Sequence, residues 1–188
     1  MNNKQLLLHK ALKMFSERGY DAVGVQEICI ECGITKPTLY HYFASKQKLL
    51  ESILETNYPP LLHQIGQDAI YTDDLTLNLE QIANTFFDFT IKNEAFMRFI
   101  LTISFAPVDS DTFSAHKVYS AKLYAIMEQL FISSVPLHGN LRNKEKLLSA
   151  SFIGQIHTFS AFYLAKELSL NTAFAQKVVK QFMHGIYS

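Results

Sequence analysis

GITKPTLYHYF, residues 33–43, is the stretch that decides the fold of the N-terminal part of this 188-residue chain. Gly33 favours a tight turn after a short helix at residues 25–31, since glycine is the usual residue just past a helix C-terminus. Thr35 is a good N-cap for the next helix, and Pro37 suits a first helical turn, where its missing N–H costs nothing. Two short helices with this spacing predict a helix-turn-helix.

The second helix of this motif has side chains that suit duplex DNA. Such a helix can lie in the major groove, with its first residues facing base edges and its backbone amides facing phosphate. Hydroxyl, aromatic and basic groups are available for these contacts on Lys36, Thr38, Tyr40, His41, Tyr42 and Lys46. Spacing alone leaves two interpretations equally open, which are DNA binding and the ordinary packing of tyrosines on neighbouring helices.

The composition favours a helical protein with a substantial core. Hydrophobic residues make up 48% of the chain, and 7 Gly with 5 Pro are too few for a loop-rich β protein. Two cysteines cannot form a disulfide scaffold, and we find no signal-peptide pattern and no apolar run that would span a membrane. We therefore expect a cytoplasmic protein with no membrane partner.

The net charge is zero, with 17 basic and 17 acidic residues, but the charge is unevenly distributed. Residues 1–50 contain seven bases and four acids, a net charge of +3, so the remaining 138 residues carry −3. A basic N-terminal part on an acidic body is a weak indication of an anionic partner for the first part only.

Helical spacing continues through the rest of the chain, so we predict an all-α fold. The two prolines Pro59 and Pro60 are expected to break or kink the chain between two of the helices. The expected helices cover about residues 3–18, 25–31, 36–43, 46–57, 61–71, 75–92, 94–105, 110–134, 144–167 and 172–186.

Residues 6–54 combine many of these features at fixed spacing and resemble the N-terminal domain of TetR-family transcriptional regulators. The resemblance is carried by Ala11, Leu12, Phe15, Gly19, Tyr20, Val25, Ile28, all of residues 33–43, Ser45, Lys46, Leu49 and Leu50. It implies a homodimer of all-α subunits, each with a three-helix helix-turn-helix DNA-binding domain and a larger C-terminal helical domain that binds an effector and dimerises. We place these domains at residues 1–48 and 49–188.

The resemblance also implies which residues bind DNA. Thr35 would cap the recognition helix and touch phosphate, and Leu39 and Phe43 would pack in the domain core. Gly24 departs from the family pattern because it provides no side-chain oxygen for phosphate, so backbone contacts should be weaker or differently distributed. The full set of expected DNA-binding residues is Gln26, Thr35, Lys36, Pro37, Thr38, Tyr40, His41, Tyr42 and Lys46.

Phenylalanine is concentrated in the C-terminal part, where 13 of the 15 Phe lie between residues 51 and 188. This aromatic bulk has two interpretations, which are an ordinary core and a cavity for a mostly apolar or planar effector that a few polar groups orient. The candidate ligand-binding residues are Phe86, Phe89, Phe99, Thr102, Tyr119, Tyr124, Phe152, Gln155, His157 and Phe159.

The last two predicted helices have the pattern of a dimer surface. Small residues along 144–167 would allow close helix approach, and apolar residues of the final helix recur at i, i+4 and i+8. Two copies pairing here would place two recognition helices about one DNA turn apart, which needs a near-palindromic operator. The candidate dimerisation residues are Gly154, Ala161, Ala165, Phe174, Val178 and Phe182.

No motif indicates catalysis, a cofactor or a metal. Cys29 and Cys32 lack the second pair that a tetrahedral site needs, so we expect them to pack as small apolar residues, with thiol sensing as the alternative. The sequence therefore predicts no enzyme but a ligand-responsive DNA-binding transcriptional regulator, a repressor that a small molecule releases from its operator. The alternative is an activator, or a DNA-bound adaptor without a small-molecule effector.

Overall fold

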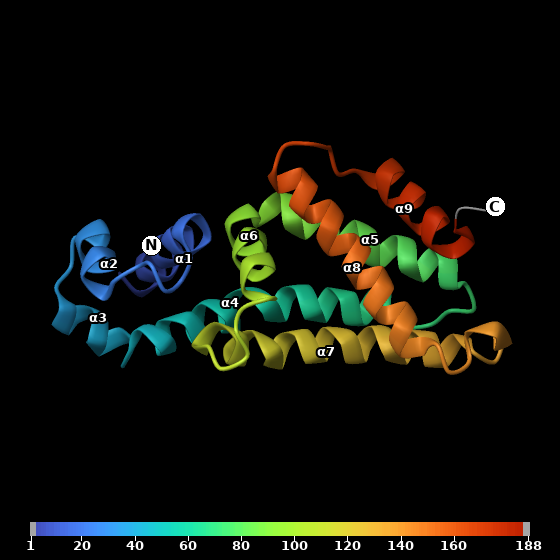
Figure 1. Cartoon of the computed structure of the whole chain (residues 1–188), viewed down its shortest axis with the longest axis horizontal. Coiled ribbons are helices and arrows are strands. Elements are labelled where there is room, and N and C mark those ends of the chain that lie inside the picture. Colours follow the sequence, from blue (N-terminus) through green and yellow to red (C-terminus); the bar gives the residue numbers. More distant parts are fainter. Residues whose placement is uncertain (1–2, 186–188) are drawn as a thin grey trace. The chain divides into compact units, whose positions relative to one another are not determined.

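The regular secondary structure is all helical over residues 3–185, the part of the chain that this computed structural model describes (Figure 1). This confirms the predicted all-α class. Over the same residues, no helix has both the length and the apolar character that crossing a bilayer requires. The elements are α1 (Asn3–Arg18), α2 (Val25–Cys32), α3 (Lys36–Tyr42), α4 (Lys46–Asp68), α5 (Leu75–Lys92), α6 (Glu94–Ile103), α7 (Asp111–Ser134), the 3-10 turn η1 (Gly139–Leu141), α8 (Glu145–Leu164) and α9 (Thr172–His184).

The described residues form two compact units that are not contiguous in sequence. The first unit contains the chain up to Pro59 together with Glu94–Val118, and the second contains Pro60–Asn93 and the chain from Tyr119 onward. The helix-turn-helix segment therefore shares a unit with α6 and the start of α7. Compact units need not coincide with functional domains, so the division into 1–48 and 49–188 stays a prediction.

In the first unit, the core joins α1 to α6. Leu7, Ala11 and Phe15 recur every four residues, so they lie on one face of α1, and all three are buried. That face packs against α6, where the rings of Phe15 and Phe99 lie 5.8 Å apart. The position of α6 is thus coupled directly to a helix that supports the helix-turn-helix.

In the second unit, α5 packs against α8 and α9 (Figure 1). Aromatic rings fill the space between these helices, with Phe87 6.0 Å from Phe174 and Phe152 5.1 Å from Phe182, measured between ring centroids. Most of the aromatic bulk noted in the sequence is used here as ordinary packing.

The expectation of a break at Pro59 and Pro60 is wrong, because α4 is a single helix from Lys46 to Asp68, while the alternative of a kink stays a prediction. The prolines lie on the exposed side of the helix, and neither can donate the usual hydrogen bond to a carbonyl four residues earlier. Tyr58, Leu61 and Ile65 keep helical spacing across the prolines and are all buried. Burial of this stripe offsets the two missing bonds, which local sequence rules could not anticipate.

Candidate nucleic-acid interface and effector pocket

The turn before α3 has the geometry that the sequence predicts. Gly33 has a φ of 65°, in the left-handed region that glycine adopts without strain, and its N–H donates to the carbonyl of Ile30. Thr35 is the N-cap of α3, and its Oγ1 accepts from the backbone N–H of Thr38 at 3.4 Å. The predicted cap is confirmed, while its contact with phosphate stays a prediction.

One face of α3 is buried and the other is open to solvent. Leu39 is fully buried and Phe43 is 3% exposed, which confirms that both pack in the core. Tyr40 is 47% exposed although it is a large aromatic residue. The outward surface presents Lys36, Pro37, Tyr40 and His41 as exposed residues, with Thr38 and Tyr42 partly exposed and Gln26 exposed on α2. The structure therefore brings eight of the nine expected DNA-binding residues, all except Lys46, onto α3, its cap or the neighbouring α2.

Lys46, the ninth, makes contacts within its own unit. Its Nζ donates to the backbone carbonyl of Tyr20 at 2.6 Å and lies 4.0 Å from the centroid of the Tyr20 ring. Burial lowers the pKa of Lys46. Burial, together with Asp111, raises the pKa of Tyr20 to about 12. Lys46 thus ties the start of α4 to the loop after α1, a structural role that its sequence position did not reveal.

Replacing Lys46 with Met should destabilise the protein by about 1–2 kcal/mol, because it removes a cation–π contact and a hydrogen bond to a partly buried carbonyl. Urea denaturation followed by circular dichroism measures this loss. The matched control is Lys48→Met, since Lys48 lies two residues further on and pairs with Glu51 on its own helix. Equal shifts of the urea midpoint in both variants would contradict the role given to Lys46.

At the start of α2, a carboxylate takes the place of a side-chain cap. Gly24 has extended backbone geometry, and its N–H donates to Oε1 of Glu27 at 3.4 Å, while Arg18 pairs with the same carboxylate. The Arg18 hydrogen bond is the main reason that the pKa of Glu27 is lowered. Arg18 is therefore neutralised within the unit, whereas Lys36 has no acidic partner within residues 3–185.

Cys29 and Cys32 lie in packed surroundings. Cys29 is 1% exposed, and burial is the largest cause of the raised pKa of each thiol. A raised pKa disfavours the thiolate, which is the reactive form in redox sensing and in metal binding. These observations support the packing role over the thiol-sensing alternative.

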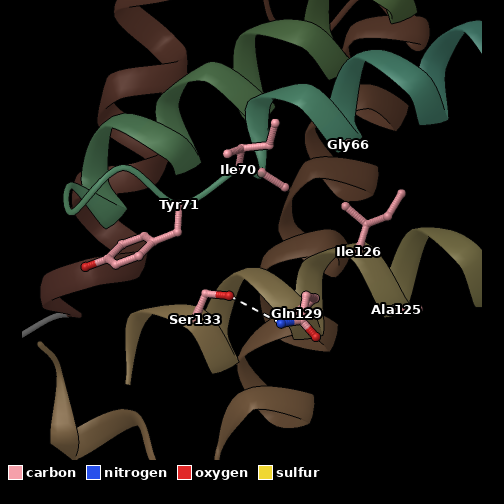
Figure 2. Close-up of a pocket in the computed structure, with 8 residues that line it drawn as sticks. Gly66, Ile70, Tyr71, Ala125, Ile126, Gln129 and Ser133 are labelled. Atoms are coloured by element: carbon pink, nitrogen blue, oxygen red, sulfur yellow. Dashed lines mark hydrogen bonds between the residues drawn. The ribbon is translucent and has the colours of Figure 1, made fainter. Parts of the chain in front are cut away.

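The second unit contains a pocket of about 670 Å³ between the end of α4 and the C-terminal half of α7 (Figure 2). Figure 2 shows Ile70 and Tyr71 on one side and Ile126, Gln129 and Ser133 on the other. The Tyr71 hydroxyl is buried and has no hydrogen-bond partner within residues 3–185. The complete lining is Gly66, Ala69, Ile70, Tyr71, Ala125, Ile126, Gln129 and Ser133.

None of the ten predicted ligand-binding residues lines this pocket. Phe86 and Phe152 are buried in the core of the second unit. Phe89, Gln155, His157 and Phe159 are partly exposed on α5 and α8, and Tyr119 and Tyr124 lie on α7. Phe99 and Thr102 belong to the first unit, where Phe99 packs on Phe15 and Thr102 is exposed. The ten residues therefore do not form one set, although Phe86 and His157 do meet, with ring centroids 6.0 Å apart.

Aromatic residues did not predict this pocket, because large side chains fill the space between helices. Gly66, Ala69 and Ala125 are small residues on facing segments of the same unit. Small side chains that face each other leave a gap, and a search for such residues on amphipathic helices could have identified these segments.

The predicted dimer residues differ between the two C-terminal helices. On α9, Phe174 and Phe182 pack on Phe87 and Phe152 and stay partly exposed, and Val178 is 3% exposed. These residues cover their own core, and their part in dimerisation stays a prediction. On α8, the small residues stay open to solvent, together with Leu147 and Phe162 beside them. The exposed residues of the predicted stripe are Gly154, Ala161 and Ala165.

A tight turn, a capped helix with one buried and one solvent-facing side, and an all-α scaffold define a helix-turn-helix DNA-binding protein. Residues 7–53 match the family model of the bacterial regulatory proteins, tetR family. The resemblance stated for the N-terminal part is thus confirmed: residues 7–53 are similar to the DNA-binding domain of TetR-family transcriptional regulators.

Comparison with known proteins places the sequence similarity mainly in the N-terminal part. The chain is 36% identical over 83 residues to the HTH-type transcriptional activator FasR of Mycolicibacterium smegmatis, a match that covers 44% of this chain and 38% of that protein. The chain thus spans well under two thirds of the length of this curated relative.

Solved structures match over nearly the whole chain. A TetR-family transcriptional regulator from Bordetella parapertussis has a TM-score of 0.79 at 23% identity, covering 98% of this chain and 95% of that one. The transcriptional regulator FadR from Bacillus subtilis, solved in complex with stearoyl-CoA, has a TM-score of 0.78 at 16% identity, covering 97% and 99%. At these identities, the likeness shows a shared fold.

Proposed function

We propose that this protein is a ligand-responsive transcriptional repressor that binds a near-palindromic operator as a homodimer and is released by a mostly apolar small molecule. The observation that carries the proposal is the solvent-facing side of α3, where Lys36 and Tyr40 are exposed opposite the buried Leu39 and Phe43. A helix held in this way can enter the major groove without disturbing its own core.

The roles on α3 follow from position along the helix. Lys36 and Tyr40 lie four residues apart on the exposed side and would face base edges, with Lys36 able to bond guanine O6 or N7. Thr35 lies at the helix N-terminus, where hydroxyl and backbone donors suit phosphate. Base contacts supply the sequence preference, and phosphate contacts supply register.

Dimerisation through α8 fits its exposed small residues. Gly154 and Ala161 are both exposed and lie about two helical turns apart, and a Cβ added to Gly154 would meet no atom within 4 Å, so a second copy of the helix could approach closely. A two-fold dimer presents two α3 helices and therefore selects two half-sites of opposite orientation.

The effector would bind in the pocket between α4 and α7. A volume of about 670 Å³ is in the range of small-molecule sites, and the lining is mostly apolar with Tyr71, Gln129 and Ser133 as polar groups. The FadR structure similar to this chain contains stearoyl-CoA, so we propose a long-chain acyl thioester as the effector class.

Electrophoretic retardation of the DNA that flanks its own gene tests this function. We expect the full chain to retard this DNA at moderate salt, stearoyl-CoA to release it, and free CoA to have no effect. If neither compound releases the DNA, the protein still binds DNA, but the proposed effector class is wrong. An absence of sequence-specific retardation would contradict the proposed function as a transcriptional regulator.

Filling the pocket should block the response to effector. A Cβ added to Gly66 meets no atom within 4 Å, and Gly66 lines the pocket, so we expect the side chain of Gly66→Leu to extend into it. We expect at least a tenfold rise in the stearoyl-CoA concentration that releases half of the DNA, with DNA affinity retained. Gln67→Leu, the next residue on the exposed side of α4, is the control and should respond like the wild type.

Activation is the second candidate, because the similar FasR protein is a transcriptional activator. An activator and a repressor can share the same operator-binding surface, so the site does not separate them. In vitro transcription from the bound promoter does: we expect the dimer to lower transcript levels, and a rise on addition of the protein would favour activation.

A further inference from the structure

The first unit contains a buried hydrogen-bond network that DNA contact and effector binding do not use. His116 on α7 is 6% exposed, and its two ring nitrogens bond to different elements. Nδ1 lies 2.7 Å from the hydroxyl of Tyr58 on α4, and Nε2 lies 3.1 Å from Oγ of Ser104, which follows α6. We call Tyr58, His116 and Ser104 the His116 network.

The positions of the hydrogens in the His116 network follow from the hydrogen bond that Ser104 makes to a backbone carbonyl. The Ser104 hydroxyl donates to the carbonyl of Ile100 at 2.6 Å, and a carbonyl can only accept. Ser104 Oγ must then accept from Nε2–H of His116, which leaves Nδ1 bare to accept from the Tyr58 hydroxyl. Every donor of the network has one acceptor, so the imidazole of His116 is a single neutral tautomer. Burial favours this neutral form and lowers the pKa of His116.

The network lies where two helices leave the first unit. Tyr58 is one residue from Pro59, the last residue of α4 in that unit, and His116 is two residues from Val118, the last residue of α7 in it. Directly beyond Tyr58, the two prolines remove two hydrogen bonds from α4, so the helix is easiest to deform there. The network therefore fixes α4 and α7 to each other on the side of the prolines that carries the DNA-binding helices.

Its third member connects to the helix-turn-helix. Ser104 continues α6, which packs on α1 through Phe99 and Phe15. Apolar packing tolerates small slides, whereas the two directional hydrogen bonds of His116 to α4 and to the end of α6 define one register. We propose that His116 is a positioning residue, and that the His116 network sets the register of α4, α6 and α7 in which α3 is placed to bind DNA.

This inference rests on the proposed function, because operator affinity is one of its two readouts. The decisive variant is Tyr58→Phe/His116→Phe, which keeps an aromatic ring at both positions and removes both hydrogen-bonding partners. It leaves fewer unpaired groups than either single change. Ser104 still donates to Ile100 in this variant. We expect the urea midpoint of the double variant to be close to that of the wild type. Each single variant should have a lower midpoint than the wild type.

For the double variant, we expect operator affinity to fall about tenfold and amide hydrogen exchange of α6 to accelerate about tenfold. If affinity and exchange return to wild-type values together with the urea midpoint, the network is structural only and the proposal is overturned. Should the wild type bind no specific DNA, the proposed function fails, and the exchange rate of α6 alone still decides the inference.

Ser104 gives a second test if the double variant does not fold. Ser104→Ala deletes one hydroxyl at a partly exposed position, and Ser104→Thr keeps it. We expect faster α6 exchange and weaker operator binding in the alanine variant, with both restored in the threonine variant. Equal behaviour of alanine and threonine variants would overturn the proposal.

Discussion

The double change Lys36→Ala/Tyr40→Ala should lower affinity for the operator by more than about 100-fold and leave the urea midpoint unchanged. Both side chains point outward from α3, and the buried contacts of the helix come from Leu39 and Phe43 instead. A contact with a base is worth about 1–3 kcal/mol, so two contacts at the middle of this range are worth about 4 kcal/mol, which is more than 100-fold in affinity. Fluorescence anisotropy with labelled operator measures the change.

Two controls separate recognition from folding. Lys13→Ala removes an exposed lysine from α1, away from α3, and should change operator affinity little. Leu39→Ala removes a fully buried side chain of α3 and should destabilise the protein by about 2–5 kcal/mol. If the outward double variant unfolded as easily as Leu39→Ala, its residues would be part of the core and not of a DNA-binding surface.

Stability should decrease by about 3 kcal/mol between pH 6.5 and pH 4 because of His116. The pKa of His116 is lowered by burial from 6.5 to about 4, so below pH 6.5 the unfolded chain binds a proton that the folded chain does not. The unfolded state then gains stability with each unit of acidification until the folded state also protonates near pH 4. Above pH 6.5 neither state is charged, and the group adds no pH dependence.

Urea denaturation at pH 7, 5.5 and 4.5 measures this effect. The Tyr58→Phe/His116→Phe variant is the control, because it has the same carboxylates and lacks the imidazole together with its Tyr58 hydroxyl partner. We expect the wild type to lose more stability than this variant across the range. Parallel curves for the two proteins would show that His116 is not held neutral by its buried position.

Local sequence rules were sufficient for the helix-turn-helix. The turn at Gly33 and the cap at Thr35 depend on contacts within a few residues, and both were predicted. The inward position of Leu39 was implied by the family resemblance and is confirmed. The same rules failed at Pro59 and Pro60, where burial of Tyr58 and Leu61 in tertiary contacts outweighs two lost hydrogen bonds.

The remaining site depends on contacts between distant segments, which periodicity does not encode. Lys46 donates a hydrogen bond to Tyr20, which lies 26 residues earlier in the chain. The pocket is lined by residues as distant in sequence as Gly66 and Ser133. On α9, an apolar stripe has the same spacing whether it faces a second copy or its own core, so Val178 could not be assigned from sequence. The role of His116 could not be predicted from the sequence, because its hydrogen-bond partners, Tyr58 and Ser104, lie on other elements.

The central claim is that α3 reads a specific DNA sequence, and one measurement tests it most directly. DNA selected from a random pool by the full-length chain is titrated against a shuffled duplex of the same composition, at one moderate salt concentration, by fluorescence anisotropy. We predict a near-palindromic selected sequence bound at least about 1,000-fold more tightly than the shuffled duplex, with this preference lost in Lys36→Ala/Tyr40→Ala. Equal affinity for both duplexes, or a preference that survives in the α3 variant, would contradict the account.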